Sequence, residues 1–221
     1  MHADGERQHE KQKIINTLQI ATDIFRLCNA EYRIVGSTLI AAHVGRVFRH
    51  IGDLDVVLDE ENKECVFEHL RKAGFTLENK MKMGFRWTEA AKDEYLGLTF
   101  LLVGKFTKDY FSRRFMKVGE IRITSDYLRR TPYHFENLEF VGIPLSSVLA
   151  GIYQSFLNPK RKIDKNVLEK EYKMVKPKIF GNIEIYIFGV KVPFLYDLFS
   201  FFYNVYGGIR IVFGKKYEIW S

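Results

Sequence analysis

The sequence has little cysteine, which limits the chemistry that sulfur can contribute. Cys28 and Cys65 are the two cysteines among 221 residues. Two thiols cannot build a disulfide framework or a cysteine-based zinc site. Both lie in sequence that is typical of helices, so we interpret them as buried structural thiols. No metal-ligand spacing is found among His43, His50, His69 and His134.

Long hydrophobic runs are also missing. The most apolar late stretch, residues 192–206, contains Asp197 and is too short to span a bilayer. The first thirteen residues are polar and mixed in charge, and they lack the apolar core of a signal peptide. We therefore expect a cytoplasmic protein with no membrane partner.

Two common catalytic patterns are absent as well. No serine–histidine–acid or cysteine–histidine arrangement can be argued from the spacing, and the chain has no Walker-type phosphate-binding loop. These absences direct attention to carboxylates and to other phosphate-binding turns.

The composition is that of a globular protein with an excess of positive charge. Hydrophobic residues make up 47% and charged residues 28%, which excludes disorder over most of the chain. The formal net charge is +7, which attracts phosphates, RNA, acidic proteins or anionic lipid without choosing among them. Residues 158–178 carry eight lysines and arginines against three acids, and so supply most of this excess.

The hydrophobic pattern predicts alternating helices and strands in the first third of the chain. We expect a helix that Ser37 or Thr38 caps, and Gly74 is well placed to end a later one. The expected elements are a helix at 10–29, a strand at 32–35, a helix to about 44, a strand at 54–58 and a helix at 61–73. This order indicates an α/β (α+β) fold, with a mixed central β-sheet flanked by helices.

The remainder of the chain predicts further strands and a C-terminal elaboration. Strands are expected at 95–103, 120–124 and 138–145, followed by a helix at 146–156. We place a core at residues 1–157 and an elaboration, a basic helix and an aromatic-rich segment, at 158–221. The basic helix is either solvated or contacts RNA. The aromatic segment predicts a packed core or a homodimer interface rather than a base-stacking surface.

The informative chemistry lies in the second expected strand. Asp53 and Asp55 are two residues apart, so both carboxylates leave the same face, about 7 Å apart along the strand. Like charges this close repel each other unless a cation lies between them. Carboxylate oxygens on a rigid strand suit Mg²⁺ or Mn²⁺, and Mg²⁺ also accepts oxygens from substrate phosphates. An acidic pair alone is common on solvated strand ends, so its neighbours decide the interpretation.

Those neighbours indicate a phosphate site. Gly36 and Ser37 form a turn that opens a helix, where backbone N–H groups and a hydroxyl can bind phosphate. Arg46 and Arg49 precede the acidic pair and offer further phosphate contacts, or are solvated or ion-paired arginines. A divalent-cation site beside a phosphate-binding turn is typical of enzymes that catalyse phosphoryl or nucleotidyl transfer.

This segment, residues 33–59, resembles the nucleotidyltransferase superfamily typified by DNA polymerase beta. In that superfamily an apolar strand ends in Gly-Ser or Gly-Gly, and a helix leads to a strand with Asp-x-Asp or Asp-x-Glu. The segment looks most like the small bacterial and archaeal nucleotidyltransferases, including those related to abortive-infection toxins, because an Arg and an Asp-x-Asp-aliphatic run recur there. The resemblance covers roughly residues 10–160.

The resemblance implies a nucleotidyltransferase-like core and a specific role for each of the site residues. Gly36 and Ser37 would hold the triphosphate of a nucleoside triphosphate, and Asp53 and Asp55 would hold two divalent ions. The implied reaction transfers a nucleoside monophosphate to a hydroxyl of RNA (including tRNA) or of a protein, with pyrophosphate leaving. Arg46 or Arg49 would be an accessory phosphate clamp.

One position departs from the family pattern. Thr99 occupies the place on the next central strand where the family has a third carboxylate. Asp93 is in phase with it but about 20 Å away along the strand, and Glu94 faces the other side. Glu139 or Glu184 could substitute only if its strand lay beside Asp55. Two hypotheses therefore remain beside an RNA-binding role for the basic stretch: an active nucleotidyltransferase, or a non-catalytic relative that binds nucleotide or a partner protein.

Overall fold

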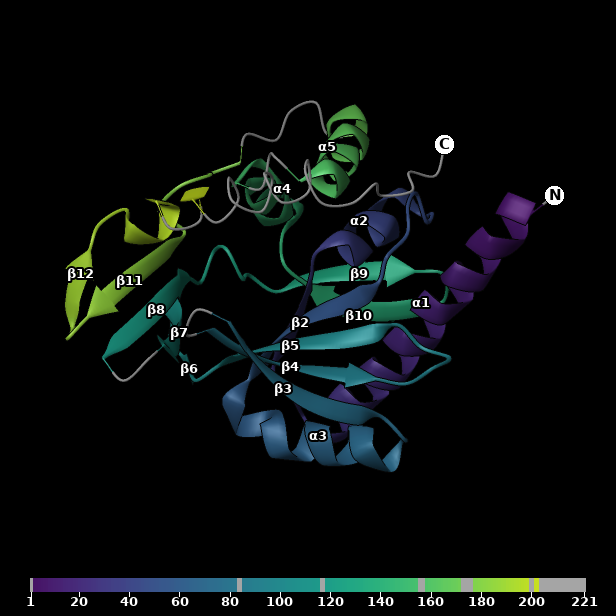
Figure 1. Ribbon diagram of the computed structural model, residues 1–221, viewed down its shortest axis with the longest axis horizontal. Coiled ribbons are helices and arrows are strands. Elements are labelled where there is room, and N and C mark those ends of the chain that lie inside the picture. The colour runs from purple at the N-terminus through teal and green to yellow at the C-terminus, as the bar shows by residue number, and fades with distance from the viewer. Residues whose placement is uncertain are drawn as a thin grey trace.

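The computed structural model describes residues 2–82, 85–115, 118–154, 158–171, 177–198 and 201–202. A mixed seven-stranded sheet flanked by helices forms the larger part, and a five-stranded antiparallel sheet lies to one side of it (Figure 1). The expected α/β class is thereby confirmed.

The helices are α1 (His2–Leu27), α2 (Ser37–Val44), α3 (Lys63–Lys72), α4 (Leu145–Gln154) and α5 (Pro159–Glu171), with a 3₁₀ turn at Glu60–Asn62. The strands of the larger sheet are β1 (Tyr32–Val35), β2 (Asp53–Asp59), β3 (Thr76–Lys82), β4 (Phe85–Ala91), β5 (Gly97–Val103), β9 (Thr131–Phe135) and β10 (Leu138–Gly142). The strands of the smaller sheet are β6 (Lys105–Phe106), β7 (Tyr110–Phe115), β8 (Gly119–Thr124), β11 (Ile183–Ile187) and β12 (Val190–Val192).

The larger sheet has the strand order β3-β4-β5-β2-β1-β10-β9. Strand β2 runs parallel to β5, and β1 runs parallel to β10, whereas the other neighbours are antiparallel. In this register Asp55 is paired with Thr99, and Thr99 is paired with Glu89. Paired residues on adjacent strands project to the same face of a sheet, so these three side chains share one face.

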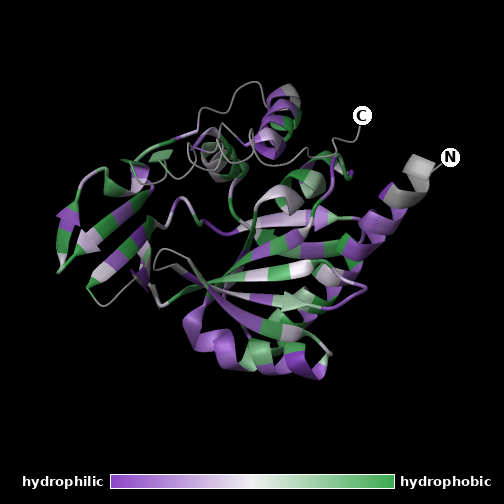
Figure 2. Cartoon of the chain, viewed as in Figure 1, coloured by the Kyte–Doolittle hydropathy of each residue, from purple (hydrophilic) through white to green (hydrophobic). Residues whose placement is uncertain are grey.

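Part of the hydrophobic core lies on the opposite face of the sheet, beneath α1 and α3. Phe100 of β5 is fully buried, and its ring makes edge-on contacts with Phe25 of α1 and Phe67 of α3. Leu54 and Val56 of β2 alternate with the two aspartates and are buried on this side. Figure 2 shows hydrophobic residues concentrated along the strands of the larger sheet. The period of two in β2 therefore separates a dry face from an acidic face.

The other face of the sheet carries α2, with α4 and α5 beyond it (Figure 1). Helix α2 is short, five of its eight residues are apolar, and residues 38–42 are buried. It packs against β9, β1 and α5. This packing places the start of α5 close to the start of α2, and both helix ends lie beside the acidic face of β2.

Several element boundaries differ from the sequence-based expectation. Helix α1 begins at His2 rather than near residue 10, and β5 begins at Gly97 rather than at residue 95. The residue that caps α2 is Gly36, without a side-chain hydrogen bond, so the expected capping by Ser37 or Thr38 is wrong. Strands β3 and β4 were not expected, because their charged and aromatic residues obscure the alternation that identifies a strand.

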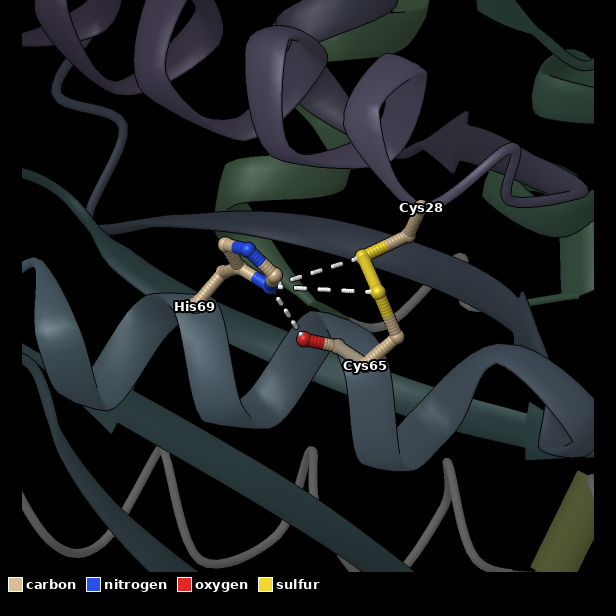
Figure 3. Close-up of side chains that lie close together, drawn as sticks. All are labelled: Cys28, Cys65 and His69. Carbon is tan, nitrogen blue, oxygen red and sulfur yellow. Dashed lines mark hydrogen bonds between the residues drawn. A yellow bond between two sulfur atoms is a disulfide. The ribbon is translucent and has the colours of Figure 1, made fainter.

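The cysteines are joined, contrary to the expectation of two free thiols. Cys28, directly after α1, forms a disulfide with Cys65 of α3 (Figure 3). Neither residue is fully buried. The two helices pack against the same face of the sheet, which brings residues 37 positions apart in the sequence within bonding distance.

Two further expectations concern the membrane and the aromatic C-terminal segment. Among the described residues, no helix is both long enough and apolar enough to cross a bilayer. The aromatic segment lies largely outside the described residues, and the homodimer interface expected there stays a prediction, as does the boundary at residue 158.

We expect the packing around Phe100 to contribute strongly to stability. Replacing Phe100 with alanine leaves a cavity between α1, α3 and the sheet, and should lower the free energy of unfolding by about 3–5 kcal/mol. Urea denaturation followed by circular dichroism measures the change. The matched control is Phe180→Ala, because Phe180 is 61% exposed and its loss should change stability by less than about 0.5 kcal/mol. Equal losses in the two variants would contradict the assignment of the core.

Candidate active site

A cleft of about 480 Å³ opens over the acidic face of the larger sheet. It is bounded by β2, β4 and β5 on one side and by the starts of α2 and α5 on the other. Its polar lining residues are Ser37, Arg49, Asp53, Asp55, Glu89, Thr99, Asn158, Lys160 and Arg161. Acids therefore occupy the wall formed by the sheet, and cations occupy the wall formed by the helices.

Asp53 and Asp55 form the centre of the acidic wall, as the Asp-x-Asp spacing predicts. Asp53 is exposed at the start of β2, and Asp55 is half-buried one pleat further along. The hydroxyl of Thr99 donates to Oδ2 of Asp53 over 3.4 Å. Thr99 thus lies beside the pair at the expected position, where it supplies a neutral oxygen instead of a charged one.

A third carboxylate reaches the same cleft from one strand further out. Glu89 of β4 is paired with Thr99, so its side chain shares the face of Asp53 and Asp55. It is half-buried, and the indole Nε1–H of Trp87 donates to its Oε1 over 2.8 Å. The strand that carries Glu89 was not expected from the sequence, so this acid was missed. Only the pairing of β4 with β5 shows that Glu89 faces the cleft.

The other acids considered for this role lie elsewhere. Asp93 and Glu94 are exposed in the turn between β4 and β5. The side chain of Glu139 is 81% exposed on β10, with β1 between it and β2. Glu184 belongs to the smaller sheet, where it pairs with Lys191. None of these four residues lines the cleft.

Gly36 brings the backbone of the turn against the acidic pair. Its φ of 81° lies in the left-handed region that favours glycine. A Cβ at this position would lie 2.8 Å from Oδ2 of Asp55, closer than real Cβ contacts come. Glycine is therefore required both by the backbone conformation and by the close approach of the Asp55 carboxylate.

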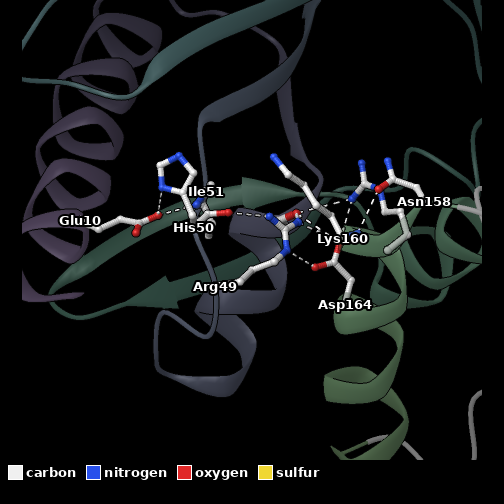
Figure 4. A network of polar contacts seen from close by, with 9 residues as sticks. Glu10, Arg49, His50, Ile51, Asn158, Lys160 and Asp164 are labelled. Carbon is white, nitrogen blue, oxygen red and sulfur yellow. Dashed lines mark hydrogen bonds and ion pairs between the residues drawn. The ribbon is translucent and has the colours of Figure 1, made fainter. Parts of the chain in front are cut away.

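The cationic wall is organised around a buried acid, Asp164 of α5 (Figure 4). Arg49 donates to it twice, from Nε to Oδ1 over 2.6 Å and from Nη2 to Oδ2 over 2.9 Å. Arg161 donates to Oδ2 over 3.0 Å. The hydroxyl of Ser37 lies 3.4 Å from the same oxygen and also accepts from Arg49 Nη2. One carboxylate thus fixes two guanidinium groups and the predicted phosphate-binding serine.

The start of α5 adds backbone donors and a further cation to this wall. Asn158 caps the helix, because its side-chain oxygen accepts from the backbone N–H of Lys160 over 3.0 Å. Pro159 occupies the first helical position, where its missing N–H costs nothing. The positive end of the helix therefore faces the cleft together with Lys160 and Arg161. Sequence reasoning identified this segment as basic but did not connect it to the aspartates.

Arg46 and Arg49 occupy different environments. Arg49 lines the cleft, and its guanidinium also donates to the carbonyl of His50 over 2.7 Å. Arg46 is exposed and is not part of the lining, so its predicted clamp role has no geometric support. His50 pairs with Glu10 of α1 over 3.1 Å, and Glu10 also accepts from the backbone N–H of Ile51 (Figure 4). These contacts tie the segment before β2 to α1.

Asp55 in the acidic wall has a raised pKa. Partial burial, followed by repulsion from Asp53, raises the pKa of Asp55 from 3.8 to about 7, although Arg161 and Arg49 oppose the rise. At neutral pH a carboxyl group in this state is about half protonated, unless another cation replaces the proton. The donor set consists of hard oxygens, those of Asp53 and Asp55, which suits Mg²⁺ or Mn²⁺. The residues present therefore fit the divalent cations that the sequence implied.

Comparison with known proteins identifies the fold. The sequence matches no known family, and no curated protein matches it. The lincosamide antibiotic adenylyltransferase LnuA, bound to lincomycin, is 17% identical, with a TM-score of 0.59 over 70% of this chain and 95% of LnuA. The solution structure of the antibiotic-resistance factor ANT(2'')-Ia is 11% identical, with a TM-score of 0.55 over 73% of this chain and 85% of its own.

A crystal structure of ANT(2'')-Ia in complex with adenylyl-2''-tobramycin is 13% identical, with a TM-score of 0.50 over 71% of this chain and 86% of its own. The chain therefore has the fold of nucleotidyltransferases. The expected likeness to that superfamily is confirmed at the level of the fold. The likeness to abortive-infection toxins stays a prediction.

The raised pKa of Asp55 predicts a specific pH dependence of stability in the absence of divalent cations. The folded state binds this proton more tightly than the unfolded state, so the contribution of Asp55 is present below about pH 4 and is lost as the pH rises through 7. Between pH 4 and pH 8 the wild type should lose about 2 kcal/mol relative to Asp55→Asn.

Urea denaturation of both proteins in EDTA, at several pH values, measures this difference directly. Other titrating groups are common to the two chains and cancel in the comparison. Parallel stability curves would contradict a raised pKa at Asp55.

Proposed function

We propose that this protein is a divalent-cation-dependent nucleotidyltransferase, which moves a nucleoside monophosphate from a nucleoside triphosphate to a hydroxyl group of an acceptor. The observation that carries the proposal is the two-walled cleft. The carboxylates of Asp53, Asp55 and Glu89 face one side, and the cations and helix N-termini that suit a triphosphate face the other. The shared fold with adenylyltransferases supports the same class of reaction.

The cationic wall binds the triphosphate. Lys160 and Arg161 contribute positive charge at the start of α5, and Arg49 lies beside them with its guanidinium held by Asp164. The backbone N–H groups of the turn at Gly36 and Ser37 lie next to Asp55, where the phosphate nearest the reacting centre would rest. The negative charge that develops on the leaving pyrophosphate is thereby stabilised by groups that are already in position.

The acidic wall binds the cations and positions the acceptor. Asp53 and Asp55 would hold Mg²⁺ or Mn²⁺, which would supply neutralisation of the phosphates and a lower pKa for the attacking hydroxyl. The same cation would stabilise the charge of Asp55 in place of its proton.

Glu89 is the proposed general base. It lies beyond Thr99 from the aspartates, on the side of the cleft away from the cationic wall. The acceptor oxygen bonds to the α-phosphorus as the bond to the pyrophosphate oxygen breaks, and the hydroxyl proton passes to the Glu89 carboxylate. Trp87 holds one oxygen of that carboxylate and leaves the other available.

A small molecule is the acceptor that the similar structures favour. LnuA is an adenylyltransferase of lincosamide antibiotics, and ANT(2'')-Ia was captured with adenylylated tobramycin. A volume of about 480 Å³ suits one nucleotide and the reacting part of an acceptor. A hydroxyl of RNA or of a protein, which the sequence suggested, is the alternative acceptor. Between RNA and protein, the basic surface of α5 favours RNA as the acceptor.

A second candidate function is nucleotide binding without transfer. Thr99 favours it, since the residue between Glu89 and Asp53 carries no charge. The two functions differ in one property: the enzyme requires Glu89 for turnover, whereas a binding protein requires only the aspartates and the cationic wall.

The metal site can be tested through nucleotide binding. Asp53→Asn or Asp55→Asn removes a charged ligand, and should weaken Mg²⁺-dependent binding of the preferred triphosphate by at least about tenfold, or about 1.4 kcal/mol. Calorimetric titration of ATP, GTP, CTP and UTP, first with Mg²⁺ and then with EDTA, measures this effect. The matched control is Asp126→Asn, an exposed aspartate outside the cleft. Wild-type affinity in both cleft variants would refute the site.

The general base can be tested by turnover. Glu89→Gln should lower kcat about 10²–10⁴-fold and leave nucleotide affinity unchanged, because the carboxylate acts on the acceptor proton. Pyrophosphate release with lincomycin, tobramycin or bulk tRNA as acceptors measures the rate. The control is Glu78→Gln, which removes an exposed glutamate on the neighbouring strand β3. Nucleotide binding without release for any acceptor would instead support the non-catalytic function.

A further inference from the structure

We propose that Cys28, Cys65 and His69 form a second metal site, specific for a thiophilic divalent cation such as Zn²⁺, which is closed while the disulfide exists and becomes available when the disulfide is reduced. Three residues of ligand type converge here from two helices. The ring nitrogen Nδ1 of His69 lies 3.8 Å from the sulfur of Cys28 and 3.8 Å from that of Cys65 (Figure 3).

Local structure holds two of the ligands in position. Cys65 and His69 are four residues apart on α3, so their side chains lie on the same face, one turn apart. Cys28 follows α1, and the contact between α1 and α3 brings it over that face. Two helices that pack against a common sheet therefore present three ligands to one point without any rearrangement of the backbone.

The separations match tetrahedral coordination. Zn²⁺ binds thiolate sulfur at about 2.3 Å and imidazole nitrogen at about 2.0–2.1 Å, which places a sulfur and a nitrogen ligand about 3.5 Å apart. The observed 3.8 Å from His69 to each sulfur is close to this value. The sulfurs themselves are bonded to each other, so no cation can lie between them in this state. Breaking that bond allows them to separate, and the His69 ring then turns so that Nδ1 leaves the Cys65 carbonyl and faces the sulfurs.

His69 has a different tautomer in the disulfide state and in the metal-binding state. Nδ1 lies 2.9 Å from the carbonyl oxygen of Cys65, and in the disulfide state its N–H donates to that oxygen. For coordination, the proton moves to Nε2, and the lone pair of Nδ1 faces the thiolates. Imidazole with two thiolates is a donor set that suits zinc in particular.

The site is accessible from solvent. A groove of about 490 Å³ runs between α1 and α3, and His69 contributes to its wall together with Asp23, Leu27 and Ala73. Cys28, Cys65 and His69 are each half-buried rather than sealed. A reductant and a cation can therefore reach the sulfurs, and a water from the groove can fill the fourth coordination position.

The chemistry balances with an ordinary dithiol as reductant. One thiolate of the dithiol attacks a disulfide sulfur, and its second thiol then displaces the mixed disulfide. The dithiol is oxidised, and Cys28 and Cys65 receive two electrons and two protons. Binding of Zn²⁺ then releases both thiol protons, so the affinity should rise with pH. A reducing compartment such as the cytoplasm, which the sequence led us to expect, would favour the metal-binding state.

The site is separate from the cleft. Phe100, which contacts α1 and α3, projects from the sheet opposite to its neighbour Thr99, which faces the cleft. Substitutions at Cys28, Cys65 or His69 therefore alter no residue of the proposed transferase site. Failure of this proposal and failure of the transferase proposal can be told apart.

Titration with Co²⁺, a spectroscopic substitute for Zn²⁺, tests the proposal. The full chain is reduced with a phosphine, desalted without oxygen and titrated beside the oxidised chain. We expect the reduced chain to bind one Co²⁺, with thiolate charge-transfer bands and tetrahedral visible bands that Zn²⁺ abolishes, and the oxidised chain to show neither. Identical spectra from both forms, or unfolding of the reduced chain seen by circular dichroism, would overturn the proposal.

Variants identify the ligands. Cys28→Ser and Cys65→Ser should each abolish the charge-transfer bands of a two-thiolate site. His69→Ala keeps the disulfide and the fold, and after reduction it should weaken Co²⁺ binding by more than about tenfold. The matched control is His134→Ala, which removes an exposed histidine on β9. Equal Co²⁺ affinity in the His69 and His134 variants would overturn the assignment of His69.

Discussion

The buried carboxylate of Asp164 is the constraint on which the geometry of the cleft depends. It is fully excluded from solvent, and it forms charge-assisted hydrogen bonds with Arg49 and Arg161. Loss of one partner of a buried pair such as Asp164 and Arg49 costs about 3–5 kcal/mol, so neither of these two groups is free to move alone. The arrangement holds the two guanidinium groups at fixed positions beside the cleft. Two guanidinium groups against one carboxylate leave a net positive charge facing the acidic wall.

The sequence predicted the parts of the site that are local in the chain. Asp53, Asp55, Gly36 and Ser37 lie within one strand–turn–helix–strand unit, where a spacing of two and a Gly-Ser turn are sufficient to place them. Glu89 and Asp164 were not found, because each depends on a long-range contact. Glu89 reaches the cleft only through the register between β4 and β5. Asp164 resembles any acid in a charged helix until α5 packs against α2.

The central sheet separates two kinds of donor. Its acidic face presents carboxylate and hydroxyl oxygens, which are hard ligands, while α1 and α3 on the other face bring sulfur and imidazole together. The two faces of the sheet thus offer hard and soft donors on different sides of one small molecule. The same alternation of side chains in β2 that buries Leu54 and Val56 under α1 and α3 also exposes the aspartates, so a single strand pattern defines both environments.

Arg49 and Asp164 are 115 positions apart in the sequence, which affects the order in which the cleft forms during co-translational folding. Chains emerge from their N-terminus, so the sheet strands β1, β2 and β5 and their aspartates leave the exit tunnel well before α5 does. During that interval Arg49 has no buried counter-ion, and the nascent domain has only the acidic half of its cleft. The cationic wall of the cleft can therefore form only after α5 has emerged and docked.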